Sequence, residues 1–245
     1  MTLKRKGVLR QAGRMLRLRP ASEAVFDRVR LAVDLRSDPV YQPLTWIGRG
    51  NADAERAQGV ETRWRVMLPV IEELGVRNGL DIGCNVGWYV FELASRGIPA
   101  LGVESHPPYY RTAMLALQQN EIQEAGILVM NVTPNNTSLL LDSDCVILLA
   151  VWHHLVRAYG LDAATDILEK VWRKTHKVLF FETGEDEMGP EYGLPAFEPD
   201  PRTWLIDYLG RHCEGATVRH LGQHHGGSGD DVVAYRNLFA VVRSA

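Results

Sequence analysis

The stretch that decides the fold of this chain is Gly79-Leu80-Asp81-Ile82-Gly83-Cys84-Asn85-Val86-Gly87. Its apolar residues predict a short β-strand, its glycines predict a tight turn, and Trp88 is the expected start of a helix. A glycine turn lets ligand atoms approach the backbone, and a helix N-terminus offers unpaired N–H groups to a carboxylate or a phosphate. The stretch therefore predicts a ligand cradle between a strand and a helix.

The spacing of the glycines narrows the choice of ligand. A dinucleotide-binding turn has the pattern Gly-x-Gly-x-x-Gly, whereas three residues separate Gly83 from Gly87 here and Asn85 stands in the middle. The chain also lacks the Gly-Lys-Ser/Thr element of a nucleoside triphosphate loop. Neither of these common nucleotide sites is predicted.

The rest of the chain from residue 78 onward alternates between short apolar runs and segments of helical length. The predicted strands are residues 80–82, 100–103, 127–132, 145–151 and 177–181, and the predicted helices are 90–96, 110–119 and 163–174. Continuously apolar runs are typical of strands covered on both faces, and the alternation predicts a parallel α/β sheet. A long helix is expected before it at 52–74, a further helix near 202–209, and an antiparallel strand pair, 216–221 and 235–242, closing the sheet.

The composition predicts one main domain with a basic extension. The 245 residues, of which 46% are apolar, are enough for one sizeable core. We expect this domain at residues 51–245, an N-terminal basic and helical extension at 1–50, and an acidic, lid-like insert at 185–201. Residues 1–20 carry seven basic and no acidic side chains, which leaves 20 basic and 30 acidic ones in 21–245. Because phosphate backbones are bound by clustered Lys and Arg, no nucleic acid partner is expected for this acidic body.

The cysteines and the apolar runs indicate a cytoplasmic protein. Cys84, Cys145 and Cys213 have no metal-finger spacing, which excludes a disulfide scaffold and a zinc ribbon. The longest apolar run, 146–152, is far shorter than the roughly 20 residues that span a bilayer, so no transmembrane segment is expected. For the basic tail, 1–20, three interpretations stay open: a loosely docked tail, a helix on a membrane surface, and a contact with a partner or with a second copy in a homodimer.

The strand–turn–helix motif resembles the first motif of the class I S-adenosylmethionine-dependent methyltransferases. That motif is an acid, one residue, and then Gly-x-x-x-Gly, which matches Asp81, Gly83 and Gly87, with Asn85 in place of the commoner middle glycine. Glu104 ends the second apolar run, where that family places an acid on the ribose hydroxyls. The resemblance covers about residues 60–182. It implies a Rossmann-like fold with a seven-stranded, mostly parallel sheet in the order 3-2-1-4-5-7-6.

The same resemblance implies that S-adenosylmethionine is the cofactor, and it suggests which residues bind it. We expect Glu104 at the ribose, Asn131 at the adenine, and Trp152 as a wall of the reaction site. Arg56 or Arg63, on the helix before the first strand, is expected to meet the carboxylate of the methyl donor. The methionine end of the donor is expected to be lined by Asp81, Gly83, Cys84, Asn85 and Gly87.

Two successive histidines at the end of the fourth strand are the candidate catalytic residues. His153 and His154 follow this strand at its carboxyl end, which is the edge where open α/β sheets bind ligands. Methyl transfer to a hydroxyl needs an aligned nucleophile and a base that takes its proton. We predict that His153 or His154 is this base and that Glu182, at the end of the fifth strand, orients the imidazole or binds a sugar hydroxyl. The alternative is a structural role for the histidines.

A divalent metal ion such as magnesium is a further candidate cofactor. Some O-methyltransferases use such an ion to hold vicinal oxygens and acidify one of them. His154, Glu182 and His225 are the candidate ligands, although their positions have no ligand spacing. A solvated loop around His225 is the other interpretation.

Three short motifs indicate the acceptor. The motifs Asp-Ile-Gly-Cys-Asn, Val-Trp-His-His-Leu and Phe-Glu-Thr-Gly are similar to those of bacterial sugar O-methyltransferases, in particular the mycobacterial enzymes that methylate mannosides in methylmannose polysaccharide synthesis, including 1-O-methylation at the reducing end. The resemblance implies a small saccharide acceptor, for which the insert with Tyr192, Phe197 and nearby Trp204 would present carboxylates and aromatic faces. RNA 2′-O or terminal methylation and a non-catalytic donor-binding protein remain the alternatives.

Overall fold

The computed structural model describes residues 29, 42–48, 54–229 and 232–244 of the chain. The chain divides into two compact units, Met1–Asp38 and Pro39–Ala245, and every described residue except Val29 belongs to the second. Most of the predicted extension, 1–50, including the basic tail, therefore lies outside the described residues. The interpretations given for the tail stay predictions.

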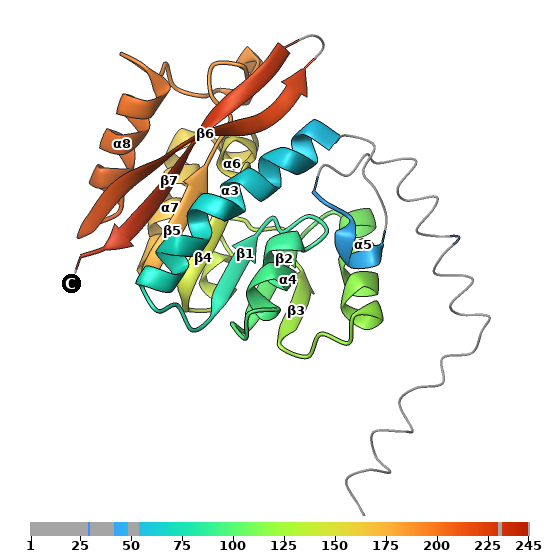
Figure 1. Cartoon of the computed structure of the whole chain (residues 1–245). Coiled ribbons are helices and arrows are strands. Elements are labelled where there is room, and N and C mark those ends of the chain that lie inside the picture. Colours follow the sequence, from blue (N-terminus) through green and yellow to red (C-terminus); the bar gives the residue numbers. More distant parts are fainter. Residues whose placement is uncertain (1–28, 30–41, 49–53, 230–231, 245) are drawn as a thin grey trace, which may run out of the picture. The chain divides into compact units, whose positions relative to one another are not determined.

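The described strands form one sheet of the predicted type. They are β1 (Gly79–Ile82), β2 (Ala100–Glu104), β3 (Ala125–Val129), β4 (Ser143–Leu149), β5 (Thr175–Glu182), β6 (Ala216–Gly229) and β7 (Val232–Arg243). In the described part of the chain the seven strands are ordered β3-β2-β1-β4-β5-β7-β6 (Figure 1). The strands β1 to β5 pair in parallel, and β7 runs antiparallel to β5 and β6. The predicted fold class and strand order are confirmed.

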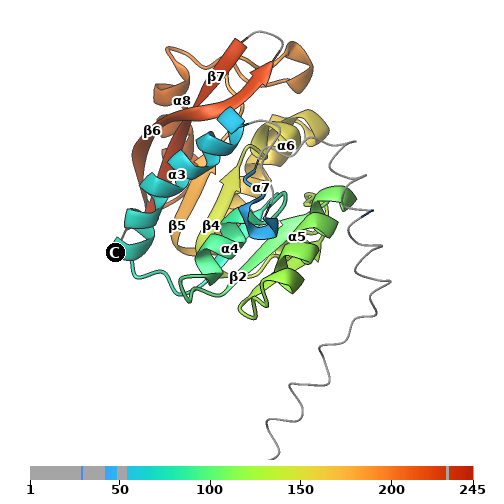
Figure 2. The ribbon, with the colours of Figure 1, turned by 45° about the vertical axis from the view of Figure 1, so that its right-hand side comes forward.

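Helices cover both faces of the sheet. The described helices are α3 (Ala54–Glu73), α4 (Trp88–Ala94), α5 (Pro107–Gln119), α6 (Trp152–Tyr159), α7 (Leu161–Arg173) and α8 (Pro201–His212). The helices α3, α4 and α5 lie on one face, and α6, α7 and α8 lie on the other (Figures 1 and 2). None of the described helices combines the length and the apolar character needed to cross a membrane.

The strand β4 shows why its run of sequence is continuously apolar. All of its residues are buried, and successive side chains of a strand point to opposite faces. Cys145 and Ile147 therefore pack into the core beneath α3, α4 and α5, whereas Val146 and Leu148 pack into the core beneath α6, α7 and α8. A central strand of this kind needs apolar residues at every position.

Two elements differ from the prediction. The helix α6 follows β4 almost directly, where the sequence analysis expected no helix. The hairpin of β6 and β7 is longer than expected, because β6 continues to Gly229 and includes the segment that had a solvated loop as one interpretation. The pairing of β5 with β7 ends at Phe181 opposite Phe239. The hairpin therefore continues past the carboxyl end of β5, beside one end of α3 (Figure 1).

Candidate functional site

The turn after β1 has the backbone conformation that its glycine pattern predicts. Gly83, Asn85 and Gly87 all have positive φ angles, of 73°, 54° and 81°. Asn85 stands where the related motif more often has glycine, and asparagine enters this left-handed region more readily than most residues. The amides of Gly83 and Cys84 donate to the carbonyl oxygen of Val103, at 2.8 and 3.0 Å, which fixes the turn against β2.

Glu104, the last residue of β2, holds the other side of this turn. Its Oε2 accepts a hydrogen bond from the amide of Asn85 at 2.8 Å, and its Oε1 accepts one from the amide of His106 at 2.7 Å. Each carboxylate oxygen has a second lone pair. The side chain, which is 7% exposed, can therefore accept two further hydrogen bonds from a ligand with adjacent hydroxyl groups.

A cavity of about 480 Å³ lies at the carboxyl edge of the sheet. Its lining comes from the ends of β1, β2 and β4 and from the segment after β3. Among the lining residues are five that the sequence predicted for the site: Gly83, Asn85, Glu104, Asn131 and His154. The structure thus brings together residues that are spread over more than 70 positions of the chain.

A second, smaller cavity of about 20 Å³ adjoins the first, because Gly83 and Ala150 line both. A volume of this size has room for about one water-sized group. Ala150 lies between the cavities with a positive φ angle of 56°. The polar side chains that line the smaller cavity are Gln42, Arg63, Asp81, Tyr89, Glu182 and His225.

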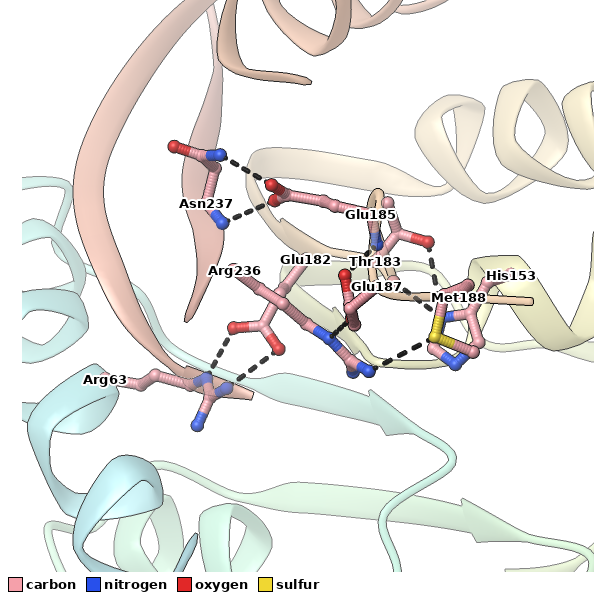
Figure 3. Close-up of polar contacts among 10 residues, drawn as sticks. Arg63, His153, Glu182, Thr183, Glu185, Glu187, Met188, Arg236 and Asn237 are labelled. Atoms are coloured by element: carbon pink, nitrogen blue, oxygen red, sulfur yellow. Dashed lines mark hydrogen bonds and ion pairs between the residues drawn. The ribbon is translucent and has the colours of Figure 1, made fainter. Parts of the chain in front are cut away.

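A buried ion pair forms one wall of the smaller cavity. The Nε atom of Arg63 donates to Oε2 of Glu182 at 2.5 Å, and its Nη2 atom donates to Oε1 at 2.9 Å (Figure 3). Their side chains are only 6% and 1% exposed. The expectation for Glu182 was an imidazole or a sugar, and the structure instead pairs its carboxylate with Arg63. The side chain of Arg56 lies outside the described part of the chain.

Asp81 adds a second buried acid to this cavity. Its Oδ2 atom has no hydrogen-bond partner among the described residues. Burial, followed by the nearby Glu104, raises the pKa of Asp81 well above its usual value. A cationic ligand group would stabilise the ionised form of this side chain.

The two adjacent histidines have different environments. The Nδ1 atom of His153 accepts a hydrogen bond from the amide of Gly184 at 2.8 Å and lies 3.3 Å from Oγ1 of Thr183 (Figure 3). Burial, followed by His154 and Arg236, lowers the pKa of His153 to about 2. His154 lines the larger cavity, and its pKa is lowered by burial and then by Arg236 and Arg157. His153 is therefore neutral with one nitrogen engaged, whereas His154 faces the space where a ligand fits.

Three residues predicted for the methyl donor do not line the two cavities. Cys84 is buried against Gly102, and burial raises the pKa of its thiol. Gly87 is the N-cap of α4. Trp152 is fully buried and packs against Phe181 and Tyr208. Among the described residues, these three line neither cavity. Cys84 follows Gly83 and Trp152 follows Val151, and both of these side chains are buried in the core.

The predicted metal ligands are not assembled into a site. In the described part of the chain, no group of three or more His, Cys, Asp or Glu side chains lies close enough to hold a metal ion. His154 lines the larger cavity, His225 lines the smaller one, and the carboxylate of Glu182 is held by Arg63. Glu182 and His225 meet at the smaller cavity, whereas His154 lines only the larger one, so the three do not form one ligand set.

The first part of the acidic insert is tied to the hairpin. Glu185 accepts hydrogen bonds from the amide and from Nδ2 of Asn237, at 2.6 and 2.8 Å, and Oε1 of Glu187 lies 2.6 Å from Nε of Arg236 (Figure 3). Asn237 and Arg236 belong to β7, beyond its pairing with β5. These carboxylates therefore hold the hairpin in place rather than facing an open cleft.

The aromatic residues of the insert differ in their surroundings. The ring of Tyr192 lies 5.6 Å from that of His153 and 5.7 Å from that of His154, with the guanidinium of Arg157 4.9 Å from its centroid. Phe197 packs edge-on against Trp204, on the side of the sheet that α8 covers. Of the aromatic residues predicted to meet an acceptor, Tyr192 is the one that lies beside the candidate base.

We expect Glu185→Gln to reduce the pH dependence of folding. Burial, opposed by the hydrogen bonds from Asn237, raises the pKa of Glu185 from 4.5 to about 7. A raised folded-state pKa stabilises the fold below the pKa of the unfolded chain, and this stabilisation is lost as the pH rises through about 7. Between about pH 5 and pH 8 the free energy of unfolding of the wild type should fall by on the order of 2 kcal/mol more than that of the variant. Urea unfolding at both pH values measures this difference, and parallel pH dependences would contradict it.

Comparisons with known proteins found similar structures but no similar sequences. No described protein family and no curated protein sequence matches this chain. The bifunctional kinase-methyltransferase WbdD is similar with a TM-score of 0.64 and 22% identity over 86% of this chain and 45% of WbdD. The magnesium protoporphyrin IX methyltransferase ChlM from Synechocystis PCC 6803, solved with bound S-adenosylmethionine, is similar with a TM-score of 0.56 and 17% identity over 81% of this chain and 88% of ChlM. EvdMO1 is similar with a TM-score of 0.55 and 15% identity over 89% of this chain and 47% of EvdMO1.

These likenesses define the class of fold. The chain has the fold of the class I S-adenosylmethionine-dependent methyltransferases, as its first motif predicted. It spans less than half the length of WbdD.

Proposed function

We propose that this chain is an S-adenosylmethionine-dependent methyltransferase. The observation that carries the proposal is the larger cavity, which gathers the turn at Gly83 and Asn85, the carboxylate of Glu104 and the side chain of Asn131. Glu104 has lone pairs left for two ribose hydroxyls. When bound, this donor supplies a methyl group on a positively charged sulfonium.

We further propose that the methyl group is transferred to a hydroxyl, with His154 taking the hydroxyl proton. A base works best when its pKa is near the working pH. His154 lines the larger cavity, whereas the pKa of His153 is lowered to about 2 and its Nδ1 accepts a hydrogen bond from the amide of Gly184. The cysteines are unsuited as nucleophiles, because burial raises the pKa of Cys84 and of Cys145.

The acceptor that we propose is a small saccharide, foremost a mannoside in polysaccharide synthesis. The resemblance of the three sequence motifs to sugar O-methyltransferases supports this choice. The acidic balance of residues 21–245 also favours an uncharged acceptor over a polyanion.

A labelling experiment tests the function. The full chain is incubated with methyl-labelled S-adenosylmethionine and either short α-mannosides or total RNA. We expect the label in the mannosides. Label in RNA would make the chain an RNA methyltransferase, and donor binding without any transfer would make it a non-catalytic binder. Absence of donor binding by calorimetry would overturn the proposal as a whole.

A substitution at the proposed base serves as the control for this assay. His154→Ala should bind the donor as the wild type does and lose about 100-fold or more of its transfer rate, since general base catalysis contributes about 10²–10⁴-fold. An active His154→Ala variant would remove His154 from this role and leave the rest of the proposal standing.

A further inference from the structure

A third histidine, His225, lies in the site on the hairpin. It is on β6 opposite Tyr235 of β7. The strand is held closely against α3 here, since a Cβ atom added at Gly59 would lie 2.5 Å from the carbonyl oxygen of His225. The neighbouring His224 also contacts α3, with Nδ1 3.2 Å from Oγ1 of Thr62. These contacts hold the backbone of β6 against α3 at this point, and His225 lines the smaller cavity.

Both ring nitrogens of His225 are buried, and neither has a hydrogen-bond partner among the described residues. A neutral imidazole carries one N–H donor and one lone pair. Leaving either unpaired away from water costs free energy, so buried polar groups of this kind are nearly always satisfied. The group that fills the smaller cavity is therefore expected to bond to this ring.

The strand order separates His225 from Glu104 and Asn85, two of the residues proposed to hold the donor. Glu104 and Asn85 lie at the ends of β2 and β1, on one side of β4. Glu182 ends β5 and His225 is on β6, both on the other side of β4. In this type of sheet, ligands bind along the carboxyl ends of the strands. A ligand group that meets His225 is thus on the side away from the proposed ribose and adenine positions, which is the side left for the acceptor.

The charges around the smaller cavity disfavour an anionic ligand group. Arg63 and Glu182 neutralise each other through two hydrogen bonds, and the raised pKa of Asp81 disfavours a further negative charge there. A phosphate or carboxylate would be buried without a counter-charge, which is unfavourable. A hydroxyl is neutral and about the size of a water molecule, and it both donates and accepts hydrogen bonds. It therefore matches the volume of about 20 Å³ and the chemistry of the ring.

We propose that His225 is an acceptor-binding residue that holds a hydroxyl group of the saccharide in the smaller cavity, which the Arg63–Glu182 pair also lines. This inference rests on the proposed function and assigns the acceptor side of the same site. It makes the hairpin of β6 and β7 part of the substrate-binding site and His225 a determinant of specificity for hydroxyl-bearing acceptors.

The test compares His225→Phe and His225→Asn in the full chain, with short α-mannosides and labelled S-adenosylmethionine as probes. Phenylalanine keeps the ring but loses both hydrogen bonds, so kcat/KM for the mannoside should fall by about 10- to 100-fold. Asparagine supplies a donor and an acceptor and should recover at least a third of the wild-type value. The affinity for the donor, measured by calorimetry, should stay within about twofold of the wild type in both variants.

His176→Phe is the matched control, because His176 is exposed at the start of β5, far along the strand from the site. A His225→Phe variant as active as this control would overturn the inference, and so would a loss of donor affinity, which would place His225 at the donor instead. Failure of asparagine to recover activity would reduce the role of His225 to packing. If His225→Phe does not fold, as judged by thermal unfolding, the KM of the smaller apolar variant His225→Leu for the mannoside decides, and a wild-type KM overturns the inference. A wild-type protein that labels no mannoside would refute the proposed function itself.

Discussion

Glu104→Ala should weaken the binding of S-adenosylmethionine by about 100-fold or more. A hydrogen bond to a charged group contributes about 1.5–3 kcal/mol, and the carboxylate is positioned to accept two of them from the ribose. The substitution also removes the acceptor of the Asn85 and His106 amides, at 2.8 and 2.7 Å, so the glycine turn loses its anchor to β2. Calorimetric titration of the full chain with the donor measures the loss.

Two further variants test whether the loss of donor affinity comes from the hydrogen bonds of Glu104 or from the loss of a negative charge alone. Glu124→Ala removes the same charge from an exposed position before β3, and its donor affinity should match the wild type. Glu104→Gln keeps one carbonyl acceptor but places an amide NH₂ against a backbone N–H donor, so an intermediate affinity is expected. Equal donor affinities for Glu104→Ala and Glu124→Ala would contradict the assignment of this carboxylate to the donor.

The fold could be predicted because each strand and most helices are indicated by residues that lie close together in the sequence. The apolar run of β4 shows burial on both faces, and the alternation of such runs with helical lengths leaves few topologies other than a parallel sheet. The helix α6 was missed although a signal was present. Trp152, Leu155, Val156 and Tyr159 have the spacing of one helical face. The segment is short and directly follows β4, so its apolar residues also fit the end of the strand.

The larger cavity could be predicted for a related reason. Gly83, Glu104 and Asn131 each end or follow a parallel strand, and parallel strands in one sheet end at the same edge. A residue's place along its strand was then enough to put it in the site. The direction of a side chain was not predictable in the same way, which is why Cys84 and Trp152 were expected in the site and lie in the core.

The smaller cavity could not be predicted, because its parts meet only through tertiary packing. Arg63 and Glu182 are 119 positions apart, and nothing in either segment indicates the other. Gln42, which also lines this cavity, lies in a segment without a regular pattern. The strand at His225 was not recognised because its polar, glycine-rich sequence lacks the alternation of a half-buried strand, and its pairing with β7 is what orders it.

Arg63→Met should lower the stability of the protein by about 3–5 kcal/mol. The substitution keeps most of the side-chain volume but leaves the carboxylate of Glu182, which is 1% exposed, without its counter-charge. For a domain of this size, 1 kcal/mol shifts the midpoint of thermal unfolding by about 2–4 °C, so a fall of roughly 10 °C is expected. Arg65→Met, an exposed position on the same helix, should leave the midpoint nearly unchanged. Thermal and urea unfolding of both variants measure the difference.

The double variant Arg63→Met/Glu182→Gln distinguishes the stability of the ion pair from its role in the site. Replacing both charges removes the uncompensated carboxylate, so most of the lost stability should return, with a coupling energy of about 2 kcal/mol or more in the double-mutant cycle. Methyl transfer should not return with it, because the cavity that His225 lines then lacks both the guanidinium and the carboxylate. A double variant as unstable as Arg63→Met would show that the arginine acts by packing alone. A stable and fully active double variant would exclude the ion pair from the acceptor site, since a pair kept only for the fold can be replaced without loss of turnover.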